Sequence, residues 1–453
     1  MPASVFKTFK PQRPVRRGRD PHKPVFLHPP STLNQNLTMW LQQTTPSERR
    51  TLTATFAGYG VDGFDYMIYT FLIPTLLAAW NMSKAEAGYI ATGALLTSAV
   101  GGWAAGVLAD RFGRVRVLQW TVLWFALFTF LSGFTNSFGQ LFFTRAMQGF
   151  GMGGEWAVGS VLIAETISAR HRGKAAGLVQ SSWAVGWAAS ALAFWGMYAV
   201  LPPEQAWKVL FWIGIAPAVL ILYIRRNLGE PEVFLAEQAR LRASGQRSNF
   251  LRIFHPSLLR TTVLASLLAT GMQGAYYSVT TWLPTFLKTE RHLSVLGTST
   301  YLLVLIAGSF VGYLTSAWLS DAIGRRRCFI LFAAMGAALV LSYTQIPITD
   351  SLMLVLGFPL GFFLSGIFSG MGAFLSELFP GDVRGSGQGF SYNFGRAIGA
   401  ICPALIGQLS ATLPLGQTIG WISAICYGLV IIAALALPET QGRELSPSAA
   451  PAR

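Results

Sequence analysis

The chain has 453 residues, of which 52% are hydrophobic and only 12% are charged. Soluble domains carry charge on about a quarter of their residues, so this composition excludes a soluble globular protein. The formal net charge of +15 would indicate a nucleic-acid partner in a soluble protein. Here the basic residues cluster in particular loops, which predicts membrane topology and no nucleic-acid partner.

Apolar windows of about 20 residues, long enough to cross a bilayer, recur along the chain. They predict helices over residues 52–79, 87–109, 116–135, 140–164, 175–199, 207–226, 261–286, 297–319, 328–346, 351–375, 387–410 and 417–437. The long polar stretch between residues 226 and 260 divides six helices from six. We expect an all-α membrane protein of twelve transmembrane helices.

Basic residues follow every second predicted helix, as in Arg225 and Arg226, so these loops and both termini are expected on the cytoplasmic side. The predicted organisation is a disordered basic arm (1–50), an N-terminal six-helix bundle (51–226), a cytoplasmic linker (227–260), a C-terminal six-helix bundle (261–438) and a cytoplasmic tail (439–453). Met39 is an alternative start shortly before the first helix. N-terminal sequencing of the expressed protein would decide whether residues 1–38 are translated.

The two halves repeat one pattern at a nearly constant spacing. Asp110, Gly113 and Arg114 recur 211 positions later as Asp321, Gly324 and Arg325, and Glu165 and Arg172 recur 212 positions later as Glu377 and Arg384. Agreement within one residue over this distance indicates a duplication. Two pseudo-symmetric bundles are typical of transporters that rock about a central site.

Asp62 and Asp65 interrupt the apolar run of the first predicted helix. A charge in the middle of a bilayer costs about 3 kcal/mol, so it usually faces a cavity or a partner and marks an ion or substrate path. A structural pair that joins two helices is the alternative. The duplicated positions are Met272 and Ala275. Polar residues present in one half only are therefore the candidates for transport chemistry.

The same criterion selects Arg145 and Glu155 on the fourth predicted helix, and Asn393 and Arg396 on the eleventh. Gln148 shares a helical face with Arg145. The pair Tyr276 and Tyr277 could line a pocket together with Trp183. No histidine lies inside a predicted helix, so a carboxylate is expected to carry any transported proton.

Residues 106–116, Gly-Val-Leu-Ala-Asp-Arg-Phe-Gly-Arg-Val-Arg, resemble the cytoplasmic signature of the major facilitator superfamily, and residues 317–327 resemble its weaker copy. The resemblance covers residues 50–440. The Asp62-Gly-Phe-Asp65 motif resembles aromatic acid:proton symporters, whereas residues 153–156 and 388–396 resemble sialate and monocarboxylate:proton symporters. Glu230-Pro-Glu and Leu437-Pro-Glu-Thr resemble segments of sugar porters.

The asymmetry between the halves, together with the resemblance, assigns roles to three groups of residues. In sugar:proton symporters of this superfamily, the position that matches Asp65 pairs with the one that matches Arg145. The proton-coupling set is then Asp65, Asp62, Arg145 and Glu155; the substrate-binding set is Arg396, Asn393, Gln148 and Tyr276. A charge-relay gate on the cytoplasmic side comprises Asp110, Arg111, Arg114, Glu165, Arg172, Asp321, Arg325, Glu377 and Arg384.

We expect a monomeric secondary transporter, with no enzymatic activity, cofactor or metal, that imports a small organic anion with protons across the inner membrane of a bacterium. The aspartate that couples the proton is predicted to be Asp65, with Arg145 as its counter-charge and Asp62 as helper. Alternatives are a sugar or polyol:proton symporter, a proton-driven drug exporter and a sensor that does not transport. Arg396 favours an anion over a neutral sugar, because a buried cation needs a counter-charge.

Overall fold

The computed structural model describes residues 40–167, 172–216, 218–230, 235, 250–380 and 383–441. Most of the predicted arm, linker and tail therefore lies outside the described residues. Within the described helices, the side chains of Asp110, Arg111, Arg172, Asp321 and Arg384 also lie outside the description. The described residues from Thr45 onward form one compact unit.

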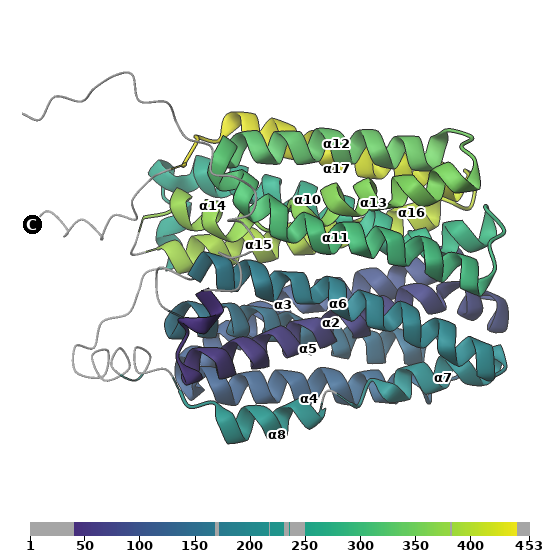
Figure 1. Cartoon of the computed structure of the whole chain (residues 1–453), viewed down its shortest axis with the longest axis horizontal. Coiled ribbons are helices and arrows are strands. Elements are labelled where there is room, and N and C mark those ends of the chain that lie inside the picture. The colour runs from purple at the N-terminus through teal and green to yellow at the C-terminus, as the bar shows by residue number, and fades with distance from the viewer. Residues whose placement is uncertain are drawn as a thin grey trace, which may run out of the picture. The chain divides into compact units, whose positions relative to one another are not determined.

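The first half is a bundle of helices that lies in the lower part of Figure 1. Its helices are α2 (Pro46–Ala79), α3 (Lys84–Phe112), α4 (Arg114–Ser132), α5 (Phe138–Thr166), α6 (Arg172–Val200), α7 (Pro203–Ile213) and α8 (Ala218–Asn227). Helix α2 begins six residues before the predicted span. The Thr45 side chain accepts a hydrogen bond from the Glu48 N–H and the Glu48 carboxylate accepts one from the Thr45 N–H, so this capping box fixes the start of the helix.

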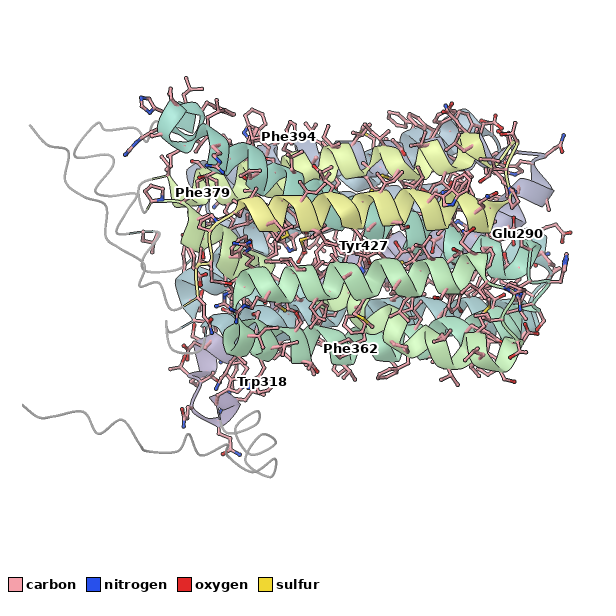
Figure 2. All side chains as sticks on the ribbon, turned by 90° about the horizontal axis from the view of Figure 1, so that it is seen from above. Glu290, Trp318, Phe362, Phe379, Phe394 and Tyr427 are labelled. Carbon is pink, nitrogen blue, oxygen red and sulfur yellow. The ribbon has the colours of Figure 1, made fainter. Side chains whose placement is uncertain are left out.

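The second half lies in the upper part of Figure 1. It contains the 3₁₀ turn η1 (Phe250–Phe254) and helices α10 (Pro256–Thr289), α11 (Val295–Ile323), α12 (Arg325–Gln345), α13 (Asp350–Gly366), α14 (Met371–Leu378), α15 (Arg384–Gly399), α16 (Ile401–Leu409) and α17 (Leu415–Ala436). Among the described residues, seven helices are long and apolar enough to cross a membrane. Figure 2 places Glu290 and Phe379 at opposite ends of these helices.

Three of the predicted spans are interrupted. The sixth is divided into α7 and α8, the tenth into α13 and α14, and the eleventh into α15 and α16. In the eleventh, Pro403 has no N–H to donate to the carbonyl of Gly399, which weakens the helix around Ala400, although α2 and α10 continue through Pro74 and Pro284. The uninterrupted apolar runs of the sequence concealed these breaks.

The joints α3–α4 and α11–α12 have the same construction in both halves. Gly113 and Gly324 have φ of 106° and 99°, values that favour glycine because it lacks a Cβ. The Glu230 carboxylate accepts hydrogen bonds from three N–H groups at the start of α4 at 2.7–3.3 Å. The Glu439 carboxylate accepts two at the start of α12, at 2.9 and 3.1 Å. These shared caps are the structural counterpart of the sequence repeat.

The halves meet where α3 packs on α16, α6 on α11 and α2 on α10. Gly88 allows α3 and α16 to approach closely. A Cβ at this position would lie only 2.5 Å from the carbonyl oxygen of Pro403, so any larger residue would push the two helices apart. The Thr92 hydroxyl donates to the carbonyl of Ala400 at 2.6 Å. Between α6 and α11, Gly177 faces Ala317 less closely. A Cβ on Gly177 would lie 3.8 Å from the Cβ of Ala317, an ordinary contact distance. Both halves therefore line the region that these three helix pairs enclose.

Candidate functional site

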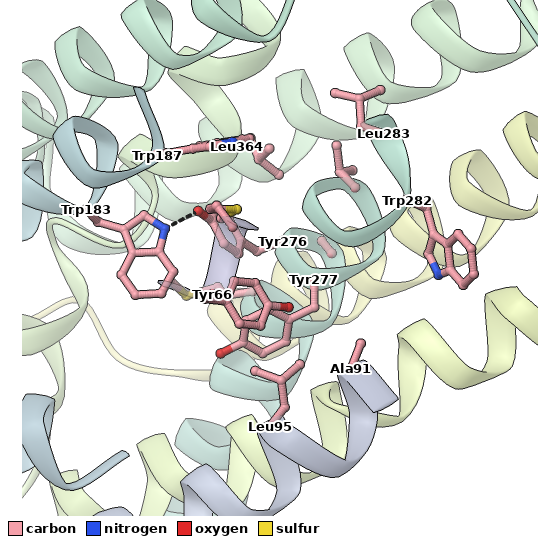
Figure 3. Packing of buried hydrophobic residues seen from close by; sticks show 14 of the residues in the cluster. Tyr66, Ala91, Leu95, Trp183, Trp187, Tyr276, Tyr277, Trp282, Leu283 and Leu364 are labelled. Atoms are coloured by element: carbon pink, nitrogen blue, oxygen red, sulfur yellow. Dashed lines mark hydrogen bonds between the residues drawn. The ribbon is translucent and has the colours of Figure 1, made fainter. Parts of the chain in front are cut away.

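A cavity between the two halves is lined mainly by aromatic side chains. Its lining residues are Tyr59, Asp62, Leu95, Met152, Trp156 and Trp183 from the first half and Tyr276, Tyr277, Tyr313, Phe368, Tyr392 and Arg396 from the second. Its volume of about 30 Å³ gives room for one or two water molecules. Figure 3 shows the Trp183 indole N–H donating to the Tyr276 hydroxyl, a bond of 2.7 Å that links the halves.

Arg396 is the cation of this cavity, and its side chain is 5% exposed. Its guanidinium donates to the Ser98 hydroxyl at 2.9 Å and to the Tyr392 hydroxyl at 3.2 Å, while Nε has no hydrogen-bond partner among the described residues. The guanidinium lies 4.9 Å from the ring centre of Tyr392 and 5.8 Å from that of Trp156. These two rings stack with their centres 4.0 Å apart.

Arg396 forms no ion pair with any carboxylate of the described chain, whose salt bridges all involve other residues. Burying a cation without a counter-ion is costly, because the protein interior solvates charge poorly. Its two hydroxyl partners and two aromatic faces reduce that cost, and no carboxylate of the described chain forms an ion pair with the guanidinium. The site is therefore electrostatically suited to an anion.

Asp65 and Arg145 form a separate buried ion pair, 3.3 Å apart and each 1% exposed. The Thr129 hydroxyl donates to the Asp65 carboxylate at 2.5 Å, and the Arg145 guanidinium also donates to the carbonyl of Asp65 at 3.3 Å. Gln148 lies against the same carboxylate. None of the four side chains lines the cavity. The predicted contact between Asp65 and Arg145 is present, and its role in proton coupling stays a prediction.

Asp62 and Glu155 form a second buried acidic group. Their carboxyl groups lie within hydrogen-bonding distance of each other, and both side chains are 1% exposed. Neither oxygen of Asp62, nor Oε2 of Glu155, accepts a hydrogen bond from any donor in the described chain. Asp62 reaches the cavity and Glu155 does not.

Two of the four predicted substrate ligands lie at the cavity. Arg396 and Tyr276 line the cavity, whereas Gln148 and Asn393 do not. Gln148 contacts Asp65 instead. The Asn393 amide donates to the carbonyl of Gly389 at 3.1 Å.

Sequence reasoning missed the tyrosines Tyr59, Tyr313 and Tyr392. Helical spacing held a signal for two of them, because Tyr59 precedes Asp62 by three residues and Tyr392 precedes Arg396 by four, which places each pair on one helix face. Tyr313 lies on α11, on which no substrate-binding or proton-coupling residue was predicted.

Four of the predicted gate residues form two ion pairs, each inside one half, and neither pair was predicted as such. Arg114 on α4 pairs with Glu165 on α5 at 3.1 Å, and Arg325 on α12 pairs with Glu377 on α14 at 3.3 Å. The Thr440 hydroxyl donates to Glu377 at 2.5 Å. The other gate side chains, those of Asp110, Arg111, Arg172, Asp321 and Arg384, lie outside the described residues. The visible pairs therefore join helices of the same half.

The chain is similar to known bacterial transporters over most of its length. It is 40% identical over 403 residues to a probable 4-methylmuconolactone transporter of Cupriavidus pinatubonensis, covering 89% of this chain and 93% of that protein. It is 31% identical to a cis,cis-muconate transport protein of Acinetobacter baylyi, covering 84% and 92%.

Among solved structures, the fold is similar to that of the proton:xylose symporter XylE bound to 6-bromo-6-deoxy-D-glucose, with a TM-score of 0.71. The sequence identity is 19%, and the match covers 88% of this chain and 98% of that one. Residues 55–318 and 298–452 match the family model described as Major Facilitator Superfamily. The chain belongs to the major facilitator superfamily and is a multi-pass membrane transporter, not an enzyme.

Proposed function

We propose that this transporter imports a small organic anion together with protons, by alternating access between two six-helix bundles with both termini in the cytoplasm. The observation that carries the proposal is Arg396, a buried guanidinium at the cavity without an ion-pair partner in the described chain. A substrate carboxylate would supply that partner, and the planar guanidinium fits a carboxylate with two parallel hydrogen bonds. Relatives named for the transport of 4-methylmuconolactone and cis,cis-muconate support an organic-acid substrate.

The aromatic lining supports a flat, unsaturated acid more than a sugar. Tyr59, Trp156 and Tyr277 present ring faces and edges, which suit the stacking of a planar ligand. A sugar needs several hydrogen-bonding groups, yet the Tyr276 hydroxyl already accepts from Trp183 and the Tyr277 hydroxyl donates to Gln273. The cavity is small in this conformation, so the walls must separate to admit a ring.

Proton coupling follows from charge. Protonation of a buried carboxylate near the cavity removes a negative charge and strengthens the binding of an anion at Arg396. By linkage, the anion raises the affinity for the proton by the same factor. Each pH unit across the membrane then supplies about 1.4 kcal/mol per proton. The set Asp62, Asp65, Arg145 and Glu155 is proposed for this role. We also propose a cytoplasmic gate. It comprises the pairs Arg114–Glu165 and Arg325–Glu377 and the other predicted gate residues, most of which recur at the same spacing in both halves.

The experiment is ligand-induced thermal stabilisation of the purified protein, since binding stabilises the folded state by RT ln(1 + [L]/Kd). The panel contains benzoate, cis,cis-muconate, sialic acid, acetate and xylose, each tested on wild type and on Arg396→Ala. We expect one or more of the carboxylates to stabilise wild type and to lose that effect in Arg396→Ala. Stabilisation by xylose alone, or by carboxylates equally in both proteins, would contradict the proposal.

A further inference from the structure

The acidic pair Asp62–Glu155 lacks the hydrogen-bond donors that two ionised carboxylates require. Asp62 is on α2 and Glu155 on α5, and the two carboxyl groups lie within hydrogen-bonding distance. Both Asp62 oxygens and Glu155 Oε2 have no donor in the described chain. By contrast, Asp65 accepts from both Thr129 and Arg145. A proton between Asp62 and Glu155 would provide the missing donor and remove the repulsion between two like charges in contact.

The charged and titratable groups that face Asp62 are few. Its own helix contributes Asp65, α5 contributes Glu155 and α15 contributes Arg396. The tyrosines of the cavity are neutral at physiological pH; they are Tyr59 on α2, Tyr276 and Tyr277 on α10, Tyr313 on α11 and Tyr392 on α15. Because Arg145 neutralises Asp65, the remaining charges are those of the acidic pair and Arg396. One proton on the pair leaves it with a single negative charge, which balances Arg396.

Gly58 provides the space that brings the pair together. It lies on α2 one turn before Asp62, and a Cβ at this position would be 2.3 Å from Oε1 of Glu155. Any side chain at position 58 would therefore displace the Glu155 carboxylate. Gly159 on α5 faces the same oxygen, but a Cβ there would lie at an ordinary contact distance of 3.7 Å.

We propose that Asp62 and Glu155 share one proton in the empty transporter and take up a second when an anion binds at Arg396, so that this pair, and not Asp65, carries the coupled proton. The inference rests on the proposed function of anion:proton symport. A substrate carboxylate neutralises Arg396, which leaves the single negative charge of the pair uncompensated. The second proton removes that charge, so one monoanion moves with one proton.

The shared proton is tested without any substrate, by infrared spectroscopy of the purified protein at neutral pH. A protonated carboxyl group has a C=O stretching band that shifts on exchange into D₂O. We expect this band in wild type and in the double variant Asp65→Asn/Arg145→Gln, which removes both charges of the neighbouring ion pair. The band should be lost in Asp62→Asn and in Glu155→Gln, because the new amide donates to the remaining carboxylate and lets it ionise. A band that disappears in Asp65→Asn/Arg145→Gln but stays in both single variants, or no band in wild type, would overturn the proposal.

Gly58→Ala tests the same point without removing a titratable group. The new methyl group must push the flexible Glu155 carboxylate away from Asp62, so the band should be lost or shifted. Gly159→Ala is the matched control, also a helical glycine next to Glu155, and should keep the wild-type band. An unchanged band in Gly58→Ala would contradict a proton shared across this contact.

Transport in proteoliposomes provides the second readout, with radiolabelled benzoate as the probe. Each single variant keeps one titratable carboxyl group, so Asp62→Asn and Glu155→Gln should each retain accumulation driven by a pH gradient. The double variant Asp62→Asn/Glu155→Gln should lose accumulation and keep benzoate counterflow, which needs no net proton movement. Accumulation by the double variant would overturn the inference. Failure of wild type to transport any carboxylate of the panel would instead overturn the proposed function, while the infrared result still decides where the proton lies.

Discussion

Arg396 lies over the ring of Tyr392, one helical turn earlier on α15, with 4.9 Å between the guanidinium carbon and the ring centre. The Tyr392 hydroxyl also accepts a hydrogen bond from the same guanidinium, at 3.2 Å. The tyrosine thus holds the arginine in one orientation at the cavity. Two predictions depend on this arrangement.

Arg396→Lys should weaken the binding of benzoate by about 1.5–3 kcal/mol, the range for hydrogen bonds to charged groups, although the charge is retained. A lysine cannot offer a planar pair of donors or stack in the same way. Isothermal titration of the purified protein measures the change. Arg291→Lys serves as the control, because Arg291 pairs with Asp350 at the exposed end of the bundle. Unchanged affinity in Arg396→Ala would remove Arg396 from the binding site.

Trp156→Leu should reduce selectivity for aromatic acids. Trp156 stacks on Tyr392 with an angle of 11° between the rings, and aromatic pairs contribute about 0.5–1.5 kcal/mol beyond the area that they bury. We expect the affinity for benzoate to fall more than the affinity for acetate. Equal losses for the two acids would indicate that Trp156 only supports the fold. Trp124→Leu, at a side chain that is 41% exposed, is the control.

Asp65→Asn should destabilise the protein by about 3–5 kcal/mol, because it leaves Arg145 buried without its counter-charge. Arg145 lies between the rings of Tyr69 and Phe211, 5.6 and 5.7 Å from their centres, and has no route to solvent at 1% exposure. The double variant Asp65→Asn/Arg145→Gln should recover much of the loss. Thermal unfolding of the three proteins in detergent measures the coupling energy. Additive losses would mean that the two residues do not act as a pair.

Glu165→Gln should slow the conformational exchange of the transporter and leave benzoate affinity within a few-fold of wild type. Glu165 pairs with Arg114 at the end of α5, outside the cavity. Asp110→Asn is expected to behave in the same way, from its place in the repeated signature. The rate of benzoate counterflow and the Kd are the two quantities to compare. A large loss of affinity with a normal counterflow rate would refute the assignment to a gate.

The sequence predicted an all-helical membrane fold because a bilayer imposes a simple rule of about 20 apolar residues on every span. Predicted starts differ from observed ones where a local cap extends the helix, as the capping box of Thr45 and Glu48 does for α2. The break at Ala400 was missed because hydropathy does not register the lost N–H of Pro403.

The candidate site was predicted only in part, for a geometric reason. Asymmetry between the halves found Asp62, Glu155 and Arg396, since a charge inside a membrane is conspicuous in sequence. It did not indicate which carboxylate contacts which cation. Asp65 lies three residues from Asp62 on the same helix, yet only Asp62 reaches the cavity. That difference depends on how α2 packs against α5, which no single-helix pattern contains.

The most direct test of the account separates the two components of the proton-motive force in proteoliposomes that contain the wild-type transporter. Benzoate uptake is measured with an imposed pH gradient at zero membrane potential, and then with an imposed potential, worth about 2.3 kcal/mol per 100 mV for each charge moved, at equal pH. One proton moving with one monoanion carries no net charge. Symport of one proton with one monoanion predicts accumulation driven by the pH gradient and none driven by the potential. Accumulation driven by the potential alone, or uptake indifferent to both, would contradict it.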